Sequence, residues 1–217
     1  MTVMSWRAQI GRYAGVGLAR VLLLSVVVVV LACWPDSGRG AGTVGDDGLH
    51  KQSWFHESFL DLREDLVEAQ ASKKGLIVAF EQAGCPYCRE MHTVNFADAE
   101  LVQYLRKNFV FVQLDIRGSR EVVDFDGAAM EERKLARRWG IVFTPTMLLF
   151  APQAAPVAGK TGKALAAAAM PGYFKPFHFH TMLEFVAGGH YASKHFQAYV
   201  NERAERLRKA GKKVKIW

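Results

Sequence analysis

Cysteine is scarce in this chain of 217 residues, which has three. Two of them, Cys85 and Cys88, are separated by two residues, and the third, Cys33, lies far upstream. A structural zinc site built on one such pair needs two further ligands, and no second cysteine pair is present to supply them. The sequence therefore excludes a four-cysteine zinc site and leaves the chemistry of Cys85 and Cys88 to be explained.

An apolar run long enough for a typical membrane span is missing as well. The run at residues 21–32 is twelve residues long, whereas a spanning helix needs about 20. A glycine-rich polar stretch follows it, and three basic residues precede it: Arg7, Arg12 and Arg20. Residues 1–40 therefore have the pattern of an export signal with its leader.

Three fates of this N-terminal segment stay open. Small residues at 38 and 40 suit cleavage before Ala41, and Leu31-Ala32-Cys33 resembles the end of a bacterial lipobox, so that Cys33 would carry a lipid. The third fate is an uncleaved membrane anchor. All three place the folded domain outside the cytoplasm, in the periplasm. Because disulfides persist there, a dithiol kept reduced in that compartment needs a supply of electrons.

The net charge of +7 does not indicate a nucleic-acid partner, because it arises at the two ends of the chain. Residues 1–40 carry a net charge of +3 and residues 203–217 one of +6, which leaves −2 between them. No basic stripe with interleaved aromatics occurs in that middle part. We predict four parts: an export segment at 1–40, a flexible linker at 41–54, one folded domain at 55–202 and a basic tail at 203–217.

Strands alternate with helices along the folded domain, which predicts a three-layer α/β fold. We expect strands at 76–80, 109–116 and 146–150, with a surface insertion at 118–127 that contains a short hairpin near 122–125. Helices are predicted at 59–69, ended by Gly75, from the cysteine pair to 108 with a bend near 95–98, and at 130–139, 177–186 and 194–207. Composition favours a helix at 164–169, but an edge strand before Gly172 fits the sheet better.

Cys85 and Cys88 lie where the first strong strand gives way to a helical pattern. Free amide groups and the positive end of the helix dipole stabilise a thiolate at such a helix start. Pro86 has the φ angle of a first helical turn and lacks an amide that would go unpaired. We therefore expect Cys85 to attack, Cys88 to resolve, and the pair to cycle between dithiol and disulfide.

Two other interpretations of the pair remain open at this point. A static structural disulfide would use the same cysteines. His92, four residues after Cys88, lies on the same helical face, so Cys85, Cys88 and His92 together would form an incomplete metal site. Four further histidines, His178, His180, His190 and His195, are too loosely spaced to indicate a metal.

A second motif makes a family resemblance specific. Thr144-Pro145 stands some sixty residues after the cysteines, directly before a predicted strand. A strand leading into C-x-x-C, with a later Thr-Pro before another strand, resembles thioredoxin over about residues 55–190. More narrowly, residues 81–92, 143–146 and 171–173 resemble the exported thioredoxins of bacterial sulfur-oxidation clusters, the SoxW-like group.

The resemblance implies a thioredoxin fold, a mixed sheet between helix layers with a short insertion and an extended C-terminal helix, and no cofactor. It also implies a cis bond at Pro145, with the backbone of Thr144 pairing with an extended substrate. A trans proline that begins an edge strand is the alternative. In the SoxW-like group a membrane thiol transporter supplies electrons for periplasmic partners in thiosulfate oxidation.

This sequence departs from the family at its buried acid. Thioredoxins commonly have an acid six residues before the first cysteine, where this chain has Ala79. Glu81 lies on the same strand face, so it is a candidate base for the resolving thiol, or else an exposed carboxylate at the strand end. We expect Tyr87 to be an exposed substrate contact and His92 to be a solvated helical residue.

The sequence as a whole predicts an exported thiol-disulfide oxidoreductase that reduces disulfides in partner proteins. An oxidase or isomerase is the alternative within this class, and it would differ only in the reduction potential of its cysteine pair. From a different class, a metal-binding or interaction module would use Cys85, Cys88 and His92 without catalysis.

Overall fold

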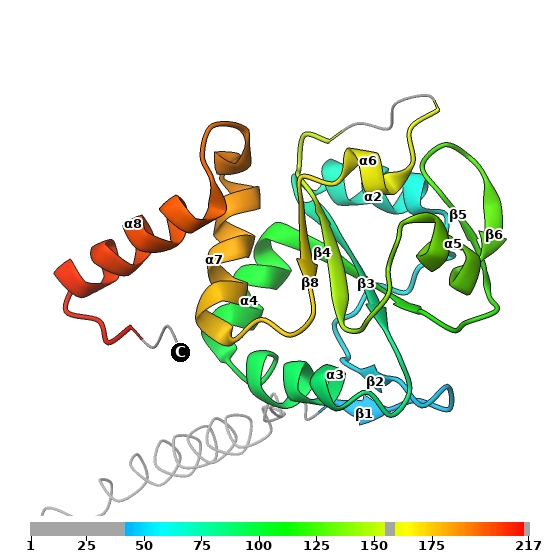
Figure 1. Ribbon diagram of the computed structural model, residues 1–217, viewed down its shortest axis with the longest axis horizontal. Helices are drawn as coiled ribbons and strands as arrows, with labels where there is room; N and C mark the ends of the chain where they lie inside the picture. The colour runs from blue at the N-terminus through cyan, green and yellow to red at the C-terminus, as the bar shows by residue number, and fades with distance from the viewer. Residues whose placement is uncertain (1–41, 155–158, 215–217) are drawn as a thin grey trace, which may run out of the picture. The chain divides into compact units, whose positions relative to one another are not determined.

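A mixed four-stranded sheet forms the centre of the domain in the computed structural model, which describes residues 42–154 and 159–214. Its strands are β3 (Gly75–Glu81), β4 (Phe109–Asp115), β7 (Thr146–Phe150) and β8 (Ala168–Pro171). They lie in the order β4-β3-β7-β8, with β3 and β4 parallel and the other two pairs antiparallel (Figure 1). The predicted α/β class and sheet are confirmed.

Helices cover both faces of this sheet. One face carries α3 (Pro86–Glu90), a π-helical turn η1 (Met91–Asn95), α4 (Ala99–Asn108) and α7 (Pro176–Ala187), and the other carries α2 (Leu62–Ala71) and α5 (Glu132–Arg138). Alternate side chains of β3 point to opposite faces, so Ile77 and Ala79 join the first apolar cluster while Val78 and Phe80 join the second. The result is the three-layer arrangement expected from the sequence.

Smaller elements surround this framework. They are β1 (Thr43–Val44), β2 (His50–Lys51), β5 (Glu121–Val123), β6 (Ala129–Glu131), α6 (Gly162–Leu165), a 3-10 turn η2 (His190–Ala192) and the long α8 (Phe196–Lys209). The helix α8 packs against α7, and Arg203 of α8 forms a two-pronged ion pair with Glu184 of α7. The part of the chain predicted as a basic tail, 203–217, continues α8 up to Lys209. Its first residue, Arg203, is buried in the domain.

Two predictions about chain breaks are confirmed. The helix after the cysteines is interrupted near 95–98, where Asp98 accepts hydrogen bonds from the backbone of Glu100 and Leu101 and so begins α4. The edge strand before Gly172 exists as β8. Composition favoured a helix at 164–169, but the helix ends at Leu165. Residues 168 and 169 belong to β8, because hydrogen bonds to β7 outweigh the helix preference of alanine.

The bounds of the first long helix differ from the prediction. The helix α2 begins at Leu62 and not at 59, because the Asp61 side chain accepts hydrogen bonds from the first free amides. Phe59 is 99% exposed. Gly75 does not end this helix but begins β3, where a Cβ atom would lie 2.4 Å from the carbonyl oxygen of Phe150. Close packing between strands explains this glycine.

A hairpin begins in the predicted insertion at 118–127 and ends after it. Its first strand, β5, lies within the insertion, and its second strand, β6, lies beyond residue 127. Met130, predicted as helical, belongs to β6. At the turn, the buried Asp124 accepts hydrogen bonds from the indole of Trp139 and the backbone of Gly162. A buried carboxylate that ties together three distant segments fixes this corner of the fold.

Residues 42–54, predicted as most of a flexible linker, form part of the domain. The strands β1 and β2 pair, Leu49 is 1% exposed, and the Trp54 ring packs edge-on against Phe96 and Phe111. Aromatic burial of this kind offsets the entropy of ordering the segment. The expected export segment at 1–40, including Cys33, lies outside the described residues. Within 42–154 and 159–214, no helix has the length and apolar character to cross a membrane.

Gly75 allows a stability test. We expect Gly75→Ala to lower the free energy of unfolding by about 1–3 kcal/mol, because the new methyl group would overlap the Phe150 carbonyl and the Phe109 ring. Gly45→Ala is the matched control, since its nearest neighbours are the ends of the flexible Asp47 and Lys51 side chains. Urea unfolding measures both variants. Equal stability of the two variants would show that β3 does not need a glycine there.

Candidate active site

Cys85 lies at the turn between β3 and α3 and caps the N-terminus of that helix. Gly84 makes the turn with a φ of +71°, a conformation that favours glycine. The Cys85 Sγ accepts a hydrogen bond from the backbone N–H of Cys88 at 3.1 Å, and Pro86 occupies the first helical turn. The predicted placement of both cysteines at a helix start is what the structure shows.

The loop before β7 approaches the first sulfur. The Sγ of Cys85 donates a hydrogen bond to the carbonyl oxygen of Thr144 at 3.5 Å, and the Thr144-Pro145 bond is cis. The structure thus brings together Cys85, Thr144 and Pro145, which are almost sixty residues apart in sequence. Both cysteines are free thiols and buried, with exposures of 7% for Cys85 and 1% for Cys88.

The second thiol is the more protected of the two. Burial, the hydrogen bond with Cys85 and the negative charge of Glu81 together raise the pKa of Cys88 far above the ordinary thiol value, with burial as the largest cause. Cys88 therefore carries its proton at neutral pH and needs a proton acceptor before it can attack a disulfide.

Glu81 is buried and not an exposed carboxylate at the strand end. Its side chain has 0% exposure at the end of β3, and its charge acts on Cys88. Both carboxylate oxygens contact the Nε2 atom of His92, at 3.1 and 3.2 Å. Of the two interpretations that the sequence left open for Glu81, the structure selects the buried carboxylate near the sulfurs.

The prediction of a solvated His92 is wrong. Its side chain is 1% exposed, because it packs edge-on against the rings of Phe55 and Phe96. Its two ring nitrogens face Glu81 and Gln52, with Gln52 Nε2 at 3.2 Å from Nδ1. The spacing of four residues indicated that His92 and Cys88 share a helical face. It could not indicate the hydrogen-bond partners Gln52 and Glu81, which lie in other elements.

Gln52 is a site residue that sequence reasoning missed. It follows β2 in the segment predicted as a linker, and it is 7% exposed. No motif marks it, because its role comes from the folding of the N-terminal hairpin against η1. A contact between residues forty positions apart leaves no local signal in the sequence.

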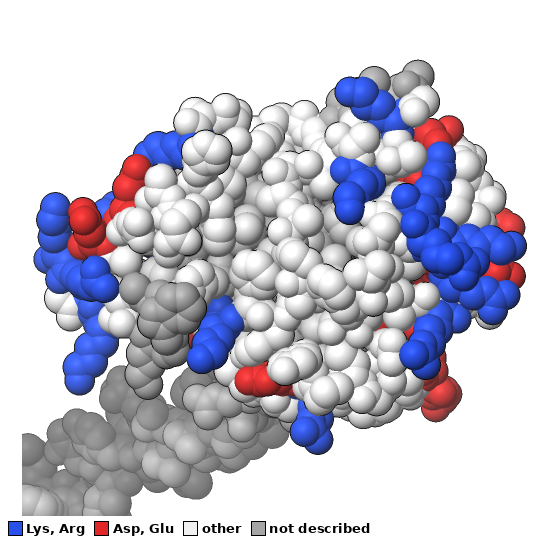
Figure 2. All heavy atoms as spheres, viewed as in Figure 1, with Lys and Arg blue, Asp and Glu red and all other residues white. Residues whose placement is uncertain are grey.

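The rim of the site is apolar and exposed. Tyr87 is 57% exposed and stacks on Tyr173 at 6.4 Å between ring centroids, while Val142 and Phe143, just before Thr144, are 77% and 52% exposed. The Tyr173 hydroxyl donates to the buried Asn95 of η1. On the face shown in Figure 2, Lys and Arg gather over α8 and around α5, and the surface between them is largely uncharged. Tyr87 has the exposure that the sequence analysis expected.

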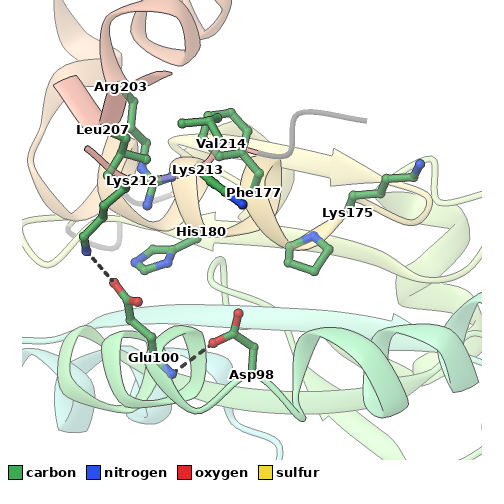
Figure 3. Close-up of a pocket in the computed structure, with 11 residues that line it drawn as sticks. Asp98, Glu100, Lys175, Phe177, His180, Arg203, Leu207, Lys212, Lys213 and Val214 are labelled. Atoms are coloured by element: carbon green, nitrogen blue, oxygen red, sulfur yellow. Dashed lines mark hydrogen bonds and ion pairs between the residues drawn. The ribbon is translucent and has the colours of Figure 1, made fainter. Parts of the chain in front are cut away.

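A hollow without either cysteine in its lining lies among α4, α7 and the end of α8 (Figure 3). Its volume is about 460 Å³. Charged groups of both signs line it, and Lys212 approaches Glu100 at 3.9 Å across it. His180 is half-buried here and lies 3.5 Å from Glu184. Among the described residues, His, Cys, Asp and Glu side chains form no cluster of three that could hold a metal ion.

An enzyme of thiol-disulfide exchange is the class that this fold and this dithiol define. A model of the family described as "Thioredoxin-like domain" matches residues 62–187, and the chain belongs to that family. The match spans the cysteine pair, Thr144 and Pro145.

Two solved structures are similar to this chain, and the first of them supports the fold. A thioredoxin-fold protein from Helicobacter pylori is 23% identical, with a TM-score of 0.50 over 61% of this chain and 86% of that one. A thioredoxin from Thermus thermophilus is 24% identical, with a TM-score of 0.44 over 62% and 94% of the two chains. A search of curated protein sequences found no match.

The raised pKa of Cys88 predicts its reactivity. In reduced Cys85→Ser protein at pH 8.5, we expect iodoacetamide to alkylate Cys88 at least about tenfold more slowly than in the same protein unfolded in urea. A raised pKa keeps the thiol protonated, and burial blocks the reagent. Peptide mapping by mass spectrometry measures the rates. Equal rates in the folded and unfolded protein would contradict the assignment.

Proposed function

We propose that this protein is an exported reductase of disulfides in partner proteins, with Cys85 as the attacking thiol and Cys88 as the resolving thiol. The supporting observation is the unequal setting of the two sulfurs. Cys85 Sγ accepts an N–H hydrogen bond at the start of α3 and contacts the rim loop at Thr144, whereas the pKa of Cys88 is raised by burial, by the hydrogen bond with Cys85 and by the charge of Glu81.

The chemistry proceeds in two exchange steps. The Cys85 thiolate attacks one sulfur of a partner disulfide, forms a mixed disulfide and releases the other partner sulfur as a thiolate. Cys88 then loses its proton and attacks Cys85 Sγ, which forms the Cys85-Cys88 disulfide and releases the second partner sulfur. Two electrons pass from the enzyme dithiol to the partner disulfide, and each released thiolate takes a proton from solvent.

Glu81 is the proton acceptor for the second step. It is buried, its charge acts on Cys88, and an ionised carboxylate is a hydrogen-bond acceptor without a donor of its own. Its proton returns to solvent after the partner leaves.

The substrate lies across Pro86, Tyr87, Thr144 and Pro145. An extended peptide would pair with the backbone of Thr144, whose carbonyl already contacts Cys85 Sγ, and would cover the exposed Phe143 and Tyr87 rings. Backbone pairing reads no particular sequence, so this groove suits a range of protein disulfides better than one small molecule.

The cellular setting of this proposal comes from the sequence. The basic residues and the short apolar run within 1–40 support export to the periplasm, followed by cleavage before Ala41, lipid attachment at Cys33 or retention as a membrane anchor. A dithiol in an oxidising compartment needs a reductant, and a membrane thiol-electron transporter is the class of donor that fits. Service to thiosulfate oxidation rests on the resemblance to the SoxW-like thioredoxins.

The roles of the two cysteines can be tested by trapping. We expect Cys88→Ser protein to accumulate mixed disulfides with partner proteins through Cys85, because the resolving thiol is missing. Non-reducing gels of periplasmic extract, followed by mass spectrometry, identify the adducts. The matched Cys85→Ser variant should trap few or none.

Reduction of insulin by the dithiol form of the protein tests the direction of the reaction. We expect wild-type protein to reduce insulin and both serine variants to lose turnover. Equal trapping by the two serine variants would reverse or cancel the assigned roles, and absence of insulin reduction by the wild-type protein would overturn the reductase proposal.

A further inference from the structure

The Glu81 carboxylate, whose charge acts on Cys88, belongs to a buried hydrogen-bonded chain of three side chains. Gln52, His92 and Glu81 come from three separate elements and have exposures of 7%, 4% and 0%. In the part of the chain that the structure describes, no buried side-chain nitrogen or oxygen lacks a hydrogen-bond partner. The three side chains therefore satisfy one another in a setting that solvent hardly reaches.

We propose that Gln52 and His92 act as a positioning pair that fixes the protonation pattern and the aim of the Glu81 carboxylate for the proton of Cys88. The proposal rests on the function proposed above for Cys85 and Cys88 and goes beyond it. It assigns a role in thiol-disulfide exchange to the N-terminal hairpin, which lies outside the residues matched by the family model.

The direction of the hydrogen bonds follows from the donor set. The side-chain nitrogen of Gln52 has only protons to offer, so the Nδ1 atom of His92, 3.2 Å away, accepts. In a neutral imidazole the other nitrogen then carries the proton. Nε2–H donates to the two oxygens of Glu81 at 3.1 and 3.2 Å, which leaves that carboxylate as an ionised acceptor.

A change of the His92 tautomer would prevent Glu81 from acting as a base. If His92 carried its proton on Nδ1, the lone pair of Nε2 would face the carboxylate of Glu81, and the buried charge would lose its donor. The carboxylate would then hold a proton of its own in order to donate to Nε2. A protonated Glu81 cannot accept the proton of Cys88, so the second exchange step would slow.

Another histidine and a cationic side chain lie near His92. His50 on β2 faces it at 5.3 Å between ring centroids, and burial is the largest cause that lowers the pKa of His50. Arg89 lies one helical turn before His92 and adds positive charge to this corner. Glu81 is the acidic group in direct contact with the His92 ring, and the Phe55 and Phe96 rings pack around it.

The first test reads the protonation pattern directly. In the reduced full-length chain at pH 7, 15N NMR of labelled histidine should show His92 with a protonated Nε2 and a bare Nδ1. In Gln52→Leu protein the preference should fall by about threefold to tenfold, as expected for the loss of one hydrogen bond. A protonated Nδ1 in the wild-type protein, or no change in Gln52→Leu, would overturn the proposal.

The second test separates the two exchange steps. Reduced protein is mixed with a disulfide-containing peptide, quenched with acid at intervals and analysed for the Cys85 mixed disulfide by mass spectrometry. His92→Leu should form the mixed disulfide within about twofold of the wild-type rate but resolve it at least about tenfold more slowly. His92→Gln should recover part of the loss, because its amide N–H can donate to Glu81.

Gln113→Leu is the matched control. Gln113 is also a buried glutamine that holds the hairpin, and within the described residues its side chain hydrogen-bonds to His50 and Lys51 but not to His92. It should resolve the mixed disulfide at the wild-type rate. Should His92→Leu fail to fold, Gln52→Leu gives the same readout with a threefold to tenfold slowing and with His92 in place.

The outcomes distinguish this inference from the function on which it rests. Resolution at the wild-type rate in both His92→Leu and Gln52→Leu would overturn the inference and leave the reductase intact. Equal slowing in Gln113→Leu would also overturn it, since a loosened hairpin would then suffice. Absence of any Cys85 mixed disulfide in the wild-type protein would instead overturn the proposed function.

Discussion

A carboxyl group buried near the resolving thiol is the constraint on which this site depends. The carboxylate of Glu81 has no exposure, and an ionised group in such a place costs several kcal/mol unless hydrogen bonds and opposite charge compensate. The donor is His92, and His92 in turn is held by Gln52. Three elements, the strand β3, the turn η1 and the hairpin of β1 and β2, must therefore be in place together for the carboxylate to be stable. The π-helical form of η1, which inserts one residue into the helical register after α3, accompanies the burial of His92.

This arrangement gives different surroundings to two sulfurs that are three residues apart. Cys85 lies at the helix start, where a backbone N–H and the rim loop meet it, and Cys88 lies one turn further in. Burial and the nearby carboxylate raise the pKa of Cys88, so the resolving thiol does not react until the first exchange has occurred. The same carboxylate that suppresses the Cys88 thiolate is its nearest base in our proposal. In that proposal the Glu81 carboxylate both keeps Cys88 protonated before the first exchange and accepts its proton in the second.

The sequence predicted the parts of the fold that depend on local pattern. The strand into Cys85, the helix cap by cysteine, the proline in the first turn and the Thr144-Pro145 loop all follow from residue types at fixed spacing. What it missed depends on contacts between distant segments. Gly75 was taken as a helix end because its crowding by Phe150 and Phe109 is invisible along the chain. The burial of His92 and the order of residues 42–54 could not be predicted, because the two segments contact each other through His50 and Gln52 across forty residues of sequence. Alanine composition likewise favoured a helix where pairing with β7 made a strand.

The central claim is that Glu81 accepts the proton of Cys88 when the mixed disulfide resolves. Glu81→Gln tests it most directly, because the amide keeps the shape of the side chain and a hydrogen-bond acceptor for His92 but cannot take up a proton at neutral pH. The measurement is the lifetime of the Cys85 mixed disulfide after acid quench, at pH 7, in folded variant protein. The account predicts normal formation and a lifetime at least about tenfold longer than in the wild-type protein. An unchanged lifetime would contradict it and would show that Cys88 loses its proton by another route.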